Sequence, residues 1–137
     1  MLVIAEPTSD YVVEVTVDGF PVGDARGGLV VYQDDSHVEE LAKTRQGREP
    51  VVRVFSTQGD LFAPGVFESA PGPARIRIER RRHEYTFYML DERRNSWRRL
   101  DRRQPDWDQR LERKLGLTAL GTTDSVFRFT DFVLNMQ

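Results

Sequence analysis

The sequence contains no cysteine and only two histidines, His37 and His83, in 137 residues. The absence of cysteine excludes disulfide bonds, cysteine-ligated zinc and a thiol nucleophile. Two histidines leave few candidates for a histidine-rich metal site or a Ser–His–acid triad. No apolar run approaches the roughly 20 residues of a membrane-spanning helix, and the first ten residues lack the basic and apolar regions of a signal peptide. We therefore expect a soluble protein with no membrane partner, and the sequence indicates no particular compartment.

The whole chain has no large excess of one sign of charge, but its parts do. The 20 basic and 22 acidic residues give a net charge of −2. Residues 75–114 contain 14 basic and 8 acidic residues, a net of +6, and the remainder contains 6 and 14, a net of −8. Acids are interspersed among the arginines of the basic segment, which favours salt-bridged strand faces over nucleic-acid binding. The complementary halves also suggest a homo-oligomer that associates through charged faces.

Strict alternation of apolar and polar residues dominates the chain and predicts an all-β protein. In the segment 11–17, the residues YVVEVTV place Tyr11, Val13, Val15 and Val17 on one face. The length predicts a single domain, residues 1–137. Further strands are expected at 29–33, 37–45, 51–56, 75–79, 85–90, 97–100, 115–120 and 126–134, and residues 61–64 are expected to form a hydrophobic loop.

One segment has the spacing of a helix. Trp107, Leu111 and Leu115 follow one another at intervals of four residues, with Pro105 and Asp106 near the start of the segment. Proline and aspartate are favoured in the first turn of a helix. The spacing therefore predicts a short helix over residues 105–112.

Three stretches carry a family resemblance. In chain order they are 28–35 (GLVVYQDD), then 76–80 (IRIER) with 85–88 (YTFY) and Trp97, and finally 115–119 (LGLTA) with 129–132 (FTDF). Together they resemble the concanavalin A-like jelly-roll modules of bacterial proteins, especially the DUF1349 type and the C-terminal domains of family 43 β-xylosidases. The resemblance covers roughly residues 10–134. The family commonly has a further strand before the one that corresponds to residues 11–17. No such strand is evident in this sequence, which is consistent with a domain trimmed at its N-terminus.

The resemblance implies a two-sheet antiparallel β-sandwich and a non-catalytic accessory module that is lectin-like, binding carbohydrate or packing on a partner domain. Sugars are bound by aromatic faces, with planar hydrogen-bonding groups nearby. We expect a groove on one sheet in which Tyr32 and Tyr88 stack on sugar rings. Gln33, Glu40 and Arg77 are the expected hydrogen-bonding partners.

An enzyme is the first alternative, as a glycoside hydrolase or lyase-related fragment. Glycoside hydrolysis requires two carboxyl groups roughly 5–9.5 Å apart on either side of the scissile bond. Glu39 and Glu40 are adjacent, so on a strand they point to opposite faces of the sheet. We assign no catalytic residue and favour a non-catalytic protein. Because the segment 75–114 is rich in arginine, a polyanion-binding protein or a structural interaction protein is a further alternative.

A structural calcium ion is the only cofactor for which the sequence offers candidate ligands. Calcium takes six to eight oxygen ligands, typically from loops. Asp34 and Asp35 lie in an expected turn, and Asp131 lies near the last expected strand. These three aspartates are the candidate ligands.

Overall fold

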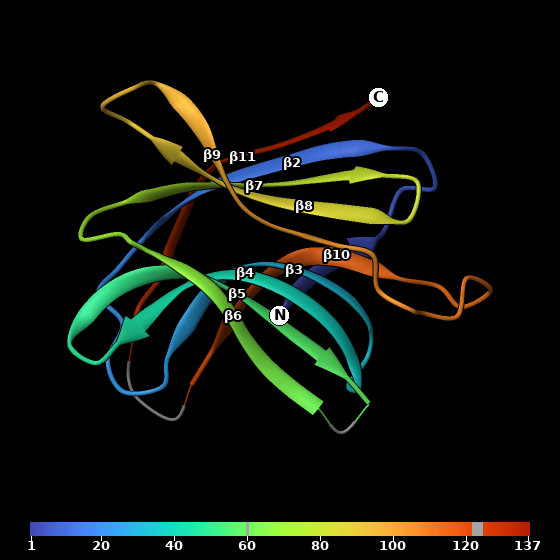
Figure 1. Cartoon of the computed structure of the whole chain (residues 1–137), viewed down its shortest axis with the longest axis horizontal. Helices are drawn as coiled ribbons and strands as arrows, with labels where there is room; N and C mark the ends of the chain where they lie inside the picture. Colours follow the sequence, from blue (N-terminus) through green and yellow to red (C-terminus); the bar gives the residue numbers. More distant parts are fainter. Residues whose placement is uncertain (60, 122–124) are drawn as a thin grey trace.

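The computed structural model describes residues 1–59, 61–121 and 125–137, and in residues 61–63 it describes the backbone only. Figure 1 shows the path of the chain. The strands are β1 (Leu2–Ala5), β2 (Tyr11–Asp18), β3 (Arg26–Asp34), β4 (His37–Gln46), β5 (Glu49–Gln58), β6 (Leu61–Ser69), β7 (Ala74–Arg81), β8 (Glu84–Asp91), β9 (Ser96–Arg103), β10 (Lys114–Leu120) and β11 (Arg128–Met136).

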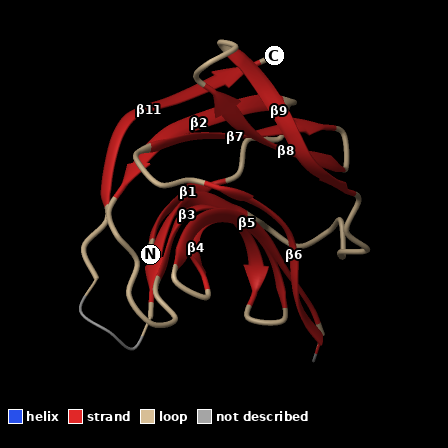
Figure 2. Ribbon diagram, turned by 60° about the vertical axis from the view of Figure 1, so that its left-hand side comes forward, coloured by secondary structure: helices blue, strands red, loops and turns tan. Residues whose placement is uncertain are grey.

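The strands form two antiparallel sheets packed face to face, which confirms the predicted β-sandwich. The six-stranded sheet has the order β1-β10-β3-β4-β5-β6, and the five-stranded sheet has the order β11-β2-β7-β8-β9. Figure 2 shows that the six-stranded sheet bends into an arch whose hollow faces away from the five-stranded sheet. Each sheet therefore has one face toward the core and one face toward solvent.

The alternating pattern explains the core. Tyr11, Val13, Val15 and Val17 of β2 are fully buried between the sheets, as predicted from their spacing. The six-stranded sheet contributes Leu29 and its neighbours of the same parity to the same cluster. The intervening side chains of both sheets are thereby directed to the two outer faces.

The predicted helix at 105–112 is wrong. These residues form a loop between β9 and β10, and the described residues contain no helix, hence none that could cross a membrane. Trp107 is 3% exposed and its ring lies 6.2 Å from that of Tyr85, whereas Leu111 is 51% exposed. Leu115 is buried as part of β10. The three residues therefore never share one buried helical face, although their spacing is helical.

Two strands differ from the expectation. Residues 61–64, expected as a loop, begin β6, where Pro64 pairs with Phe55 of β5. Because β6 is an edge strand, the missing N–H of a proline is tolerated there. The second is β1, which was not expected from the sequence; it pairs with β10 and places Ile4 opposite Leu115.

Candidate binding site

A pocket of about 280 Å³ lies in the hollow of the six-stranded sheet. Tyr32 of β3 and Glu40 of β4, both predicted as ligand-binding residues, line it together. They share this face because Val30 pairs with Glu40 and Tyr32 pairs with Val38 across the β3–β4 hairpin. The lining residues are Met1, Arg26, Val30, Tyr32, Asp35, Val38, Glu40, Phe55, Thr57 and Leu120.

An ion pair forms part of the pocket wall. Nε of Arg26 donates to Oε2 of Glu40 at 2.7 Å, and Glu40 is only 2% exposed. Burial raises the pKa of the Glu40 carboxyl, and the charge of Arg26 opposes that rise. The guanidinium carbon of Arg26 also lies 4.9 Å from the centre of the Phe55 ring, in cation–π geometry. The pair is thus held in place from two sides.

Arg26 and Phe55 were not among the ligand-binding residues predicted from the sequence. The signal that identifies them is register, because Phe55 pairs with Glu40 in the β4–β5 ladder. Arg26 is two strand positions from Gly28, on the face of β3 that also carries Val30 and Tyr32. Such cross-strand neighbours become visible only when the pairing is known.

Tyr32 is held by its own hairpin. Its hydroxyl donates to Oδ1 of Asp35 at 2.7 Å, and this hydrogen bond is the main reason why the pKa of Tyr32 is raised. The bond ties the ring to the turn between β3 and β4 and leaves its face partly exposed at the pocket. Thr57 of β5 adds a hydroxyl to the same wall.

The other three predicted ligand-binding residues lie elsewhere, so the five do not line one groove. Gln33 points away from the hollow, and its Nε2 donates to the carbonyl of Asp108 at 3.4 Å. Arg77 and Tyr88 pair with each other on β7 and β8, in the five-stranded sheet. The two hairpins belong to different sheets, which is why the expectation of a single groove fails.

The outer face of the five-stranded sheet holds Arg77 in a network of its own. Nη2 of Arg77 lies 2.9 Å from Oε2 of Glu14, and its guanidinium carbon lies 4.7 Å from the centre of the Trp97 ring. Glu14 also pairs with Arg75 at 3.3 Å. Two nitrogens of Arg77, Nε and Nη2, are thus already engaged by Glu14 within the protein.

The candidate calcium ligands are not brought together. Oδ1 of Asp34 lies 2.7 Å from Nδ1 of His37, and this hydrogen bond lowers the pKa of Asp34. Asp131 lies in a β-bulge of β11, in the other sheet, where its carbonyl accepts from Arg75 at 2.9 Å. Within 1–59, 61–121 and 125–137, no group of three or more histidine, cysteine or acidic residues is arranged to hold a metal ion.

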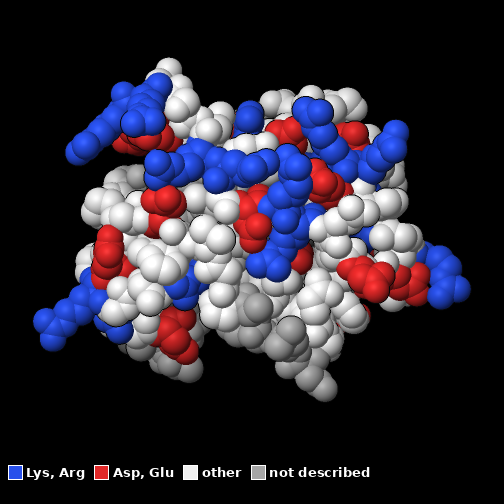
Figure 3. All heavy atoms as spheres, in the orientation of Figure 1, with Lys and Arg blue, Asp and Glu red and all other residues white. Residues whose placement is uncertain are grey.

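Most arginines of the basic segment have acidic partners. Arg80 pairs with Glu6 at 3.1 Å, Arg98 with Glu68 at 2.9 Å and Arg102 with Glu84 at 3.3 Å. Figure 3 shows basic side chains gathered over the upper, five-stranded part of the molecule, with acidic ones among them. This is the interspersed pattern that the sequence predicts.

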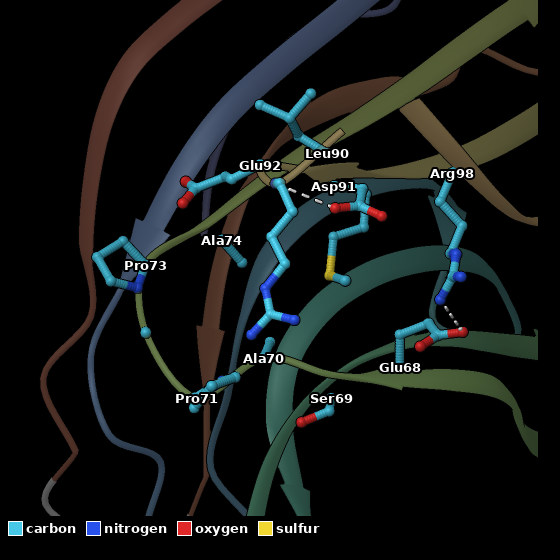
Figure 4. A pocket seen from close by; sticks show the side chains of 13 residues that line it. Glu68, Ser69, Ala70, Pro71, Pro73, Ala74, Leu90, Asp91, Glu92 and Arg98 are labelled. Atoms are coloured by element: carbon cyan, nitrogen blue, oxygen red, sulfur yellow. Dashed lines mark hydrogen bonds and ion pairs between the residues drawn. The ribbon is translucent and has the colours of Figure 1, made fainter. Parts of the chain in front are cut away.

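A larger cavity, about 530 Å³, opens at one end of the sandwich between residues 68–74 and the turn after β8. Figure 4 shows Arg98 and Glu68 directed toward each other across one side of it. Its other walls carry small apolar residues such as Ala70, Pro71 and Pro73, and its lining residues include no aromatic ring. It therefore lacks the stacking surface that the hollow of the six-stranded sheet provides.

No protein-family model matches the sequence, and the comparison with curated proteins also finds no match. Solved structures do match. The GH43 BlXynB protein from Bacillus licheniformis superposes with a TM-score of 0.82 at 14% identity, over 96% of this chain and 28% of that chain. The xylan beta-1,4-xylosidase from Bacillus halodurans C-125 gives 0.79 at 16% identity, over 97% and 29%. A functionally unknown protein from Saccharomyces cerevisiae gives 0.78 at 14% identity, over 99% and 74%.

The chain thus spans less than a third of the length of these two Bacillus chains. At these identities the comparisons bear on the fold. They confirm the resemblance stated from the sequence: the chain has the β-sandwich fold of a domain found in GH43 xylosidase chains.

Proposed function

We propose that this chain is a non-catalytic accessory module that binds carbohydrate in the hollow of its six-stranded sheet. One observation carries the proposal: the partly exposed ring of Tyr32 and the ion pair of Arg26 and Glu40 line the same pocket. A sugar presents an apolar ring face and a rim of hydroxyl groups. The pocket offers an aromatic surface for the first and planar polar groups for the second.

The state of the two carboxylates supports binding over catalysis. Glu40 is paired with Arg26, and Asp35 accepts from the hydroxyl of Tyr32. Each carboxylate has further acceptor capacity, because an ionised carboxyl group offers about four lone-pair positions. Both can therefore accept from sugar hydroxyls without giving up the contacts that position them.

The structural neighbours guide the choice of ligand. Two of them are named as a GH43 protein and a xylan beta-1,4-xylosidase, and the shared fold makes up less than a third of each chain. A β-sandwich domain that forms the smaller part of such a chain is consistent with an accessory role. Xylo-oligosaccharides are therefore the first probes, followed by a broad glycan array.

The test compares two tyrosine variants on the glycan array and by calorimetry. Tyr32→Ala removes the stacking surface and should weaken binding roughly 5- to 30-fold, from a loss of about 1–2 kcal/mol. Tyr88→Ala is the matched control, because Tyr88 lies in the other sheet and should leave binding unchanged. Absence of binding to any glycan, or equal binding by wild type and Tyr32→Ala, would refute the proposal.

A further inference from the structure

The two sheets that the structure describes end in four edge strands, β1, β6, β9 and β11. Three of them carry features that discourage pairing with another chain. β6 contains Pro64 and a register shift, β11 contains the β-bulge at Asp131, and β9 carries four arginines within residues 96–103. β1 has the residues LVIA, with no charge, no proline and no register shift against β10. β1 is therefore the edge that is open to a further strand.

The unpaired backbone groups of β1 can be assigned from its pairing with β10. The N–H of Glu6 donates to the carbonyl of Arg113 at 2.8 Å, and the backbone groups of successive residues point to alternate sides of a strand. The backbone groups of Leu2 and Ile4 therefore point toward β10, whereas the N–H and C=O groups of Val3 and Ala5 point away from it. These outward groups can bond to a further antiparallel strand.

The side chains of β1 are apolar and largely exposed. Leu2 is 75% exposed and Ile4 is 51% exposed. They lie opposite Leu117 and Leu115 of β10, which pack in the core, so all four side chains share the core-facing side of the sheet. Because β1 is the last strand of its sheet, the outer flanks of Leu2 and Ile4 are left exposed. A further strand beside β1 would cover them.

We propose that β1 pairs antiparallel with β1 of a second copy of this chain, in a weak dimer with two-fold symmetry. A two-fold axis at Val3 places Val3 opposite Val3 of the second copy. The outward N–H and C=O groups of the two Val3 residues bond to each other, and those of Ala5 bond to Met1 of the second copy. Leu2 lies beside Ile4 of the second copy, at the close spacing of a pair without hydrogen bonds.

A second copy supplies an equally free and uncharged edge strand, and the flanking residues determine the register. With the axis at Ile4 instead of Val3, the pairing would include Glu6 and Pro7. The side chain of Glu6 is charged and buried within its own copy, and Pro7 has no N–H to donate. The register centred on Val3 uses only residues 1–5, none of which has a charged side chain that would repel the second copy.

The size of this surface indicates weak association. The exposed parts of Met1, Leu2 and Ile4, with the edge of the backbone, amount to roughly 400 Å² per copy, or about 800 Å² for the pair. Stable complexes bury about 1,200–2,000 Å² in total. We therefore expect a reversible dimer with a dissociation constant of about 10–300 µM.

The dimer is tested by sedimentation equilibrium of the chain from about 5 µM to 1 mM, together with amide hydrogen exchange measured by NMR. The mass should rise from that of one copy toward that of two, and the amides of Val3 and Ala5 should exchange more slowly at high protein concentration. Association should be unchanged between about 0.05 and 0.5 M NaCl, because salt screens charges and not strand pairing. A dimer that associates through complementary charged faces would dissociate over the same range.

Two variants change the free edge and leave the pairing with β10 intact. Leu2→Lys places a charge beside Ile4 of the second copy, and Val3→Pro removes an N–H that points away from β10. Each should weaken dimerisation about tenfold or more, while the amide spectrum remains that of the folded chain. Val66→Lys is the matched control, because Val66 is 50% exposed on β6, at the opposite edge of the same sheet, and the dimer should persist.

The proposal is overturned if the chain remains a single copy at about 1 mM. It is also overturned if Leu2→Lys and Val3→Pro associate as the wild type does, or if Val66→Lys weakens the dimer equally. A dimer that salt dissociates overturns it as well, because the charged faces, and not β1, then hold the two copies together.

Discussion

Replacement of Glu39 by glutamine should stabilise the protein at neutral and alkaline pH. Glu39 is fully buried, and burial is the main reason why the pKa of its carboxyl rises from 4.5 to about 7. Asp101 adds to the rise, whereas Ser56 and Arg103 oppose it without cancelling it. In the unfolded chain the same carboxyl should have a pKa near its ordinary value. The free energy of unfolding is therefore lower at pH values where the buried carboxyl of Glu39 must be ionised.

The size and sign of the effect follow from proton linkage. Between pH 4.5 and 7 the folded protein holds a proton on Glu39 that the unfolded chain has lost, so stability falls as the pH rises. Each pKa unit is worth about 1.4 kcal/mol, which gives a total of about 3 kcal/mol at pH 8. Glutamine has nearly the same shape and no charge at any pH. The variant should match the wild type near pH 4 and exceed its stability by about 3 kcal/mol at pH 8.

The assay is denaturant unfolding of both proteins at a series of pH values from 4 to 8, with the difference in free energy of unfolding plotted against pH. Acids that do not interact with Glu39 contribute equally to both curves, so the difference reports on Glu39 and on its coupling to Asp101. Ser56→Ala is a second arm, because loss of the hydrogen bond to the carboxylate should raise the pKa of Glu39 further and extend the fall to higher pH. A difference that stays constant over the whole range would refute the reasoning.

Three further substitutions test other parts of the structure by denaturant unfolding. Gly28→Ala should destabilise by about 3 kcal/mol or more, because an added Cβ would lie 2.0 Å from the carbonyl oxygen of Leu41. Gly72→Ala is its control, with nothing within 4 Å of the added carbon, and should change stability by less than about 1 kcal/mol. Arg26→Ala should cost about 3–5 kcal/mol because it leaves the buried Glu40 unpaired, and the additional change to Glu40→Gln should recover part of that loss. Tyr85→Phe removes the hydroxyl that bridges Glu6 and Arg113, at 2.7 and 2.8 Å, and should cost about 1–3 kcal/mol.

The fold could be predicted well from the sequence, because the residues of a strand alternate between its buried face and its exposed face. The run from Tyr11 to Val17 is buried at every second position, as expected of a strand with one face on the core. The helix prediction failed because only three residues carried the period. Trp107 is a single buried residue of a loop, beside the ring of Tyr85 and the guanidinium of Arg113. Its burial is independent of Leu111 and Leu115, so the helical spacing arises without a helix.

The candidate site could be predicted only within single hairpins. Tyr32 and Glu40 line one wall because the pairing of β3 with β4 places them on the same face, whereas Gln33, next to Tyr32 on the same strand, bonds to Asp108 away from the pocket. Arg77 and Tyr88 likewise pair with each other across β7 and β8. Which sheet a hairpin joins depends on pairing with strands far away in the sequence, such as β2 with β7. Local alternation contains no information about that choice.

Phe55 and Arg26 were missed for the same reason, because their place in the pocket depends on strand pairing. Phe55 is 8% exposed, so its apolar character alone suggests an ordinary core residue. It belongs to the hollow because β5 pairs with β4 in the register that places it opposite Glu40. Arg26 then stacks on Phe55 and pairs with Glu40, so a cation, an anion and a ring from three neighbouring strands hold one another in place. A pocket wall held in this way is organised before any ligand arrives, and binding need not order these side chains.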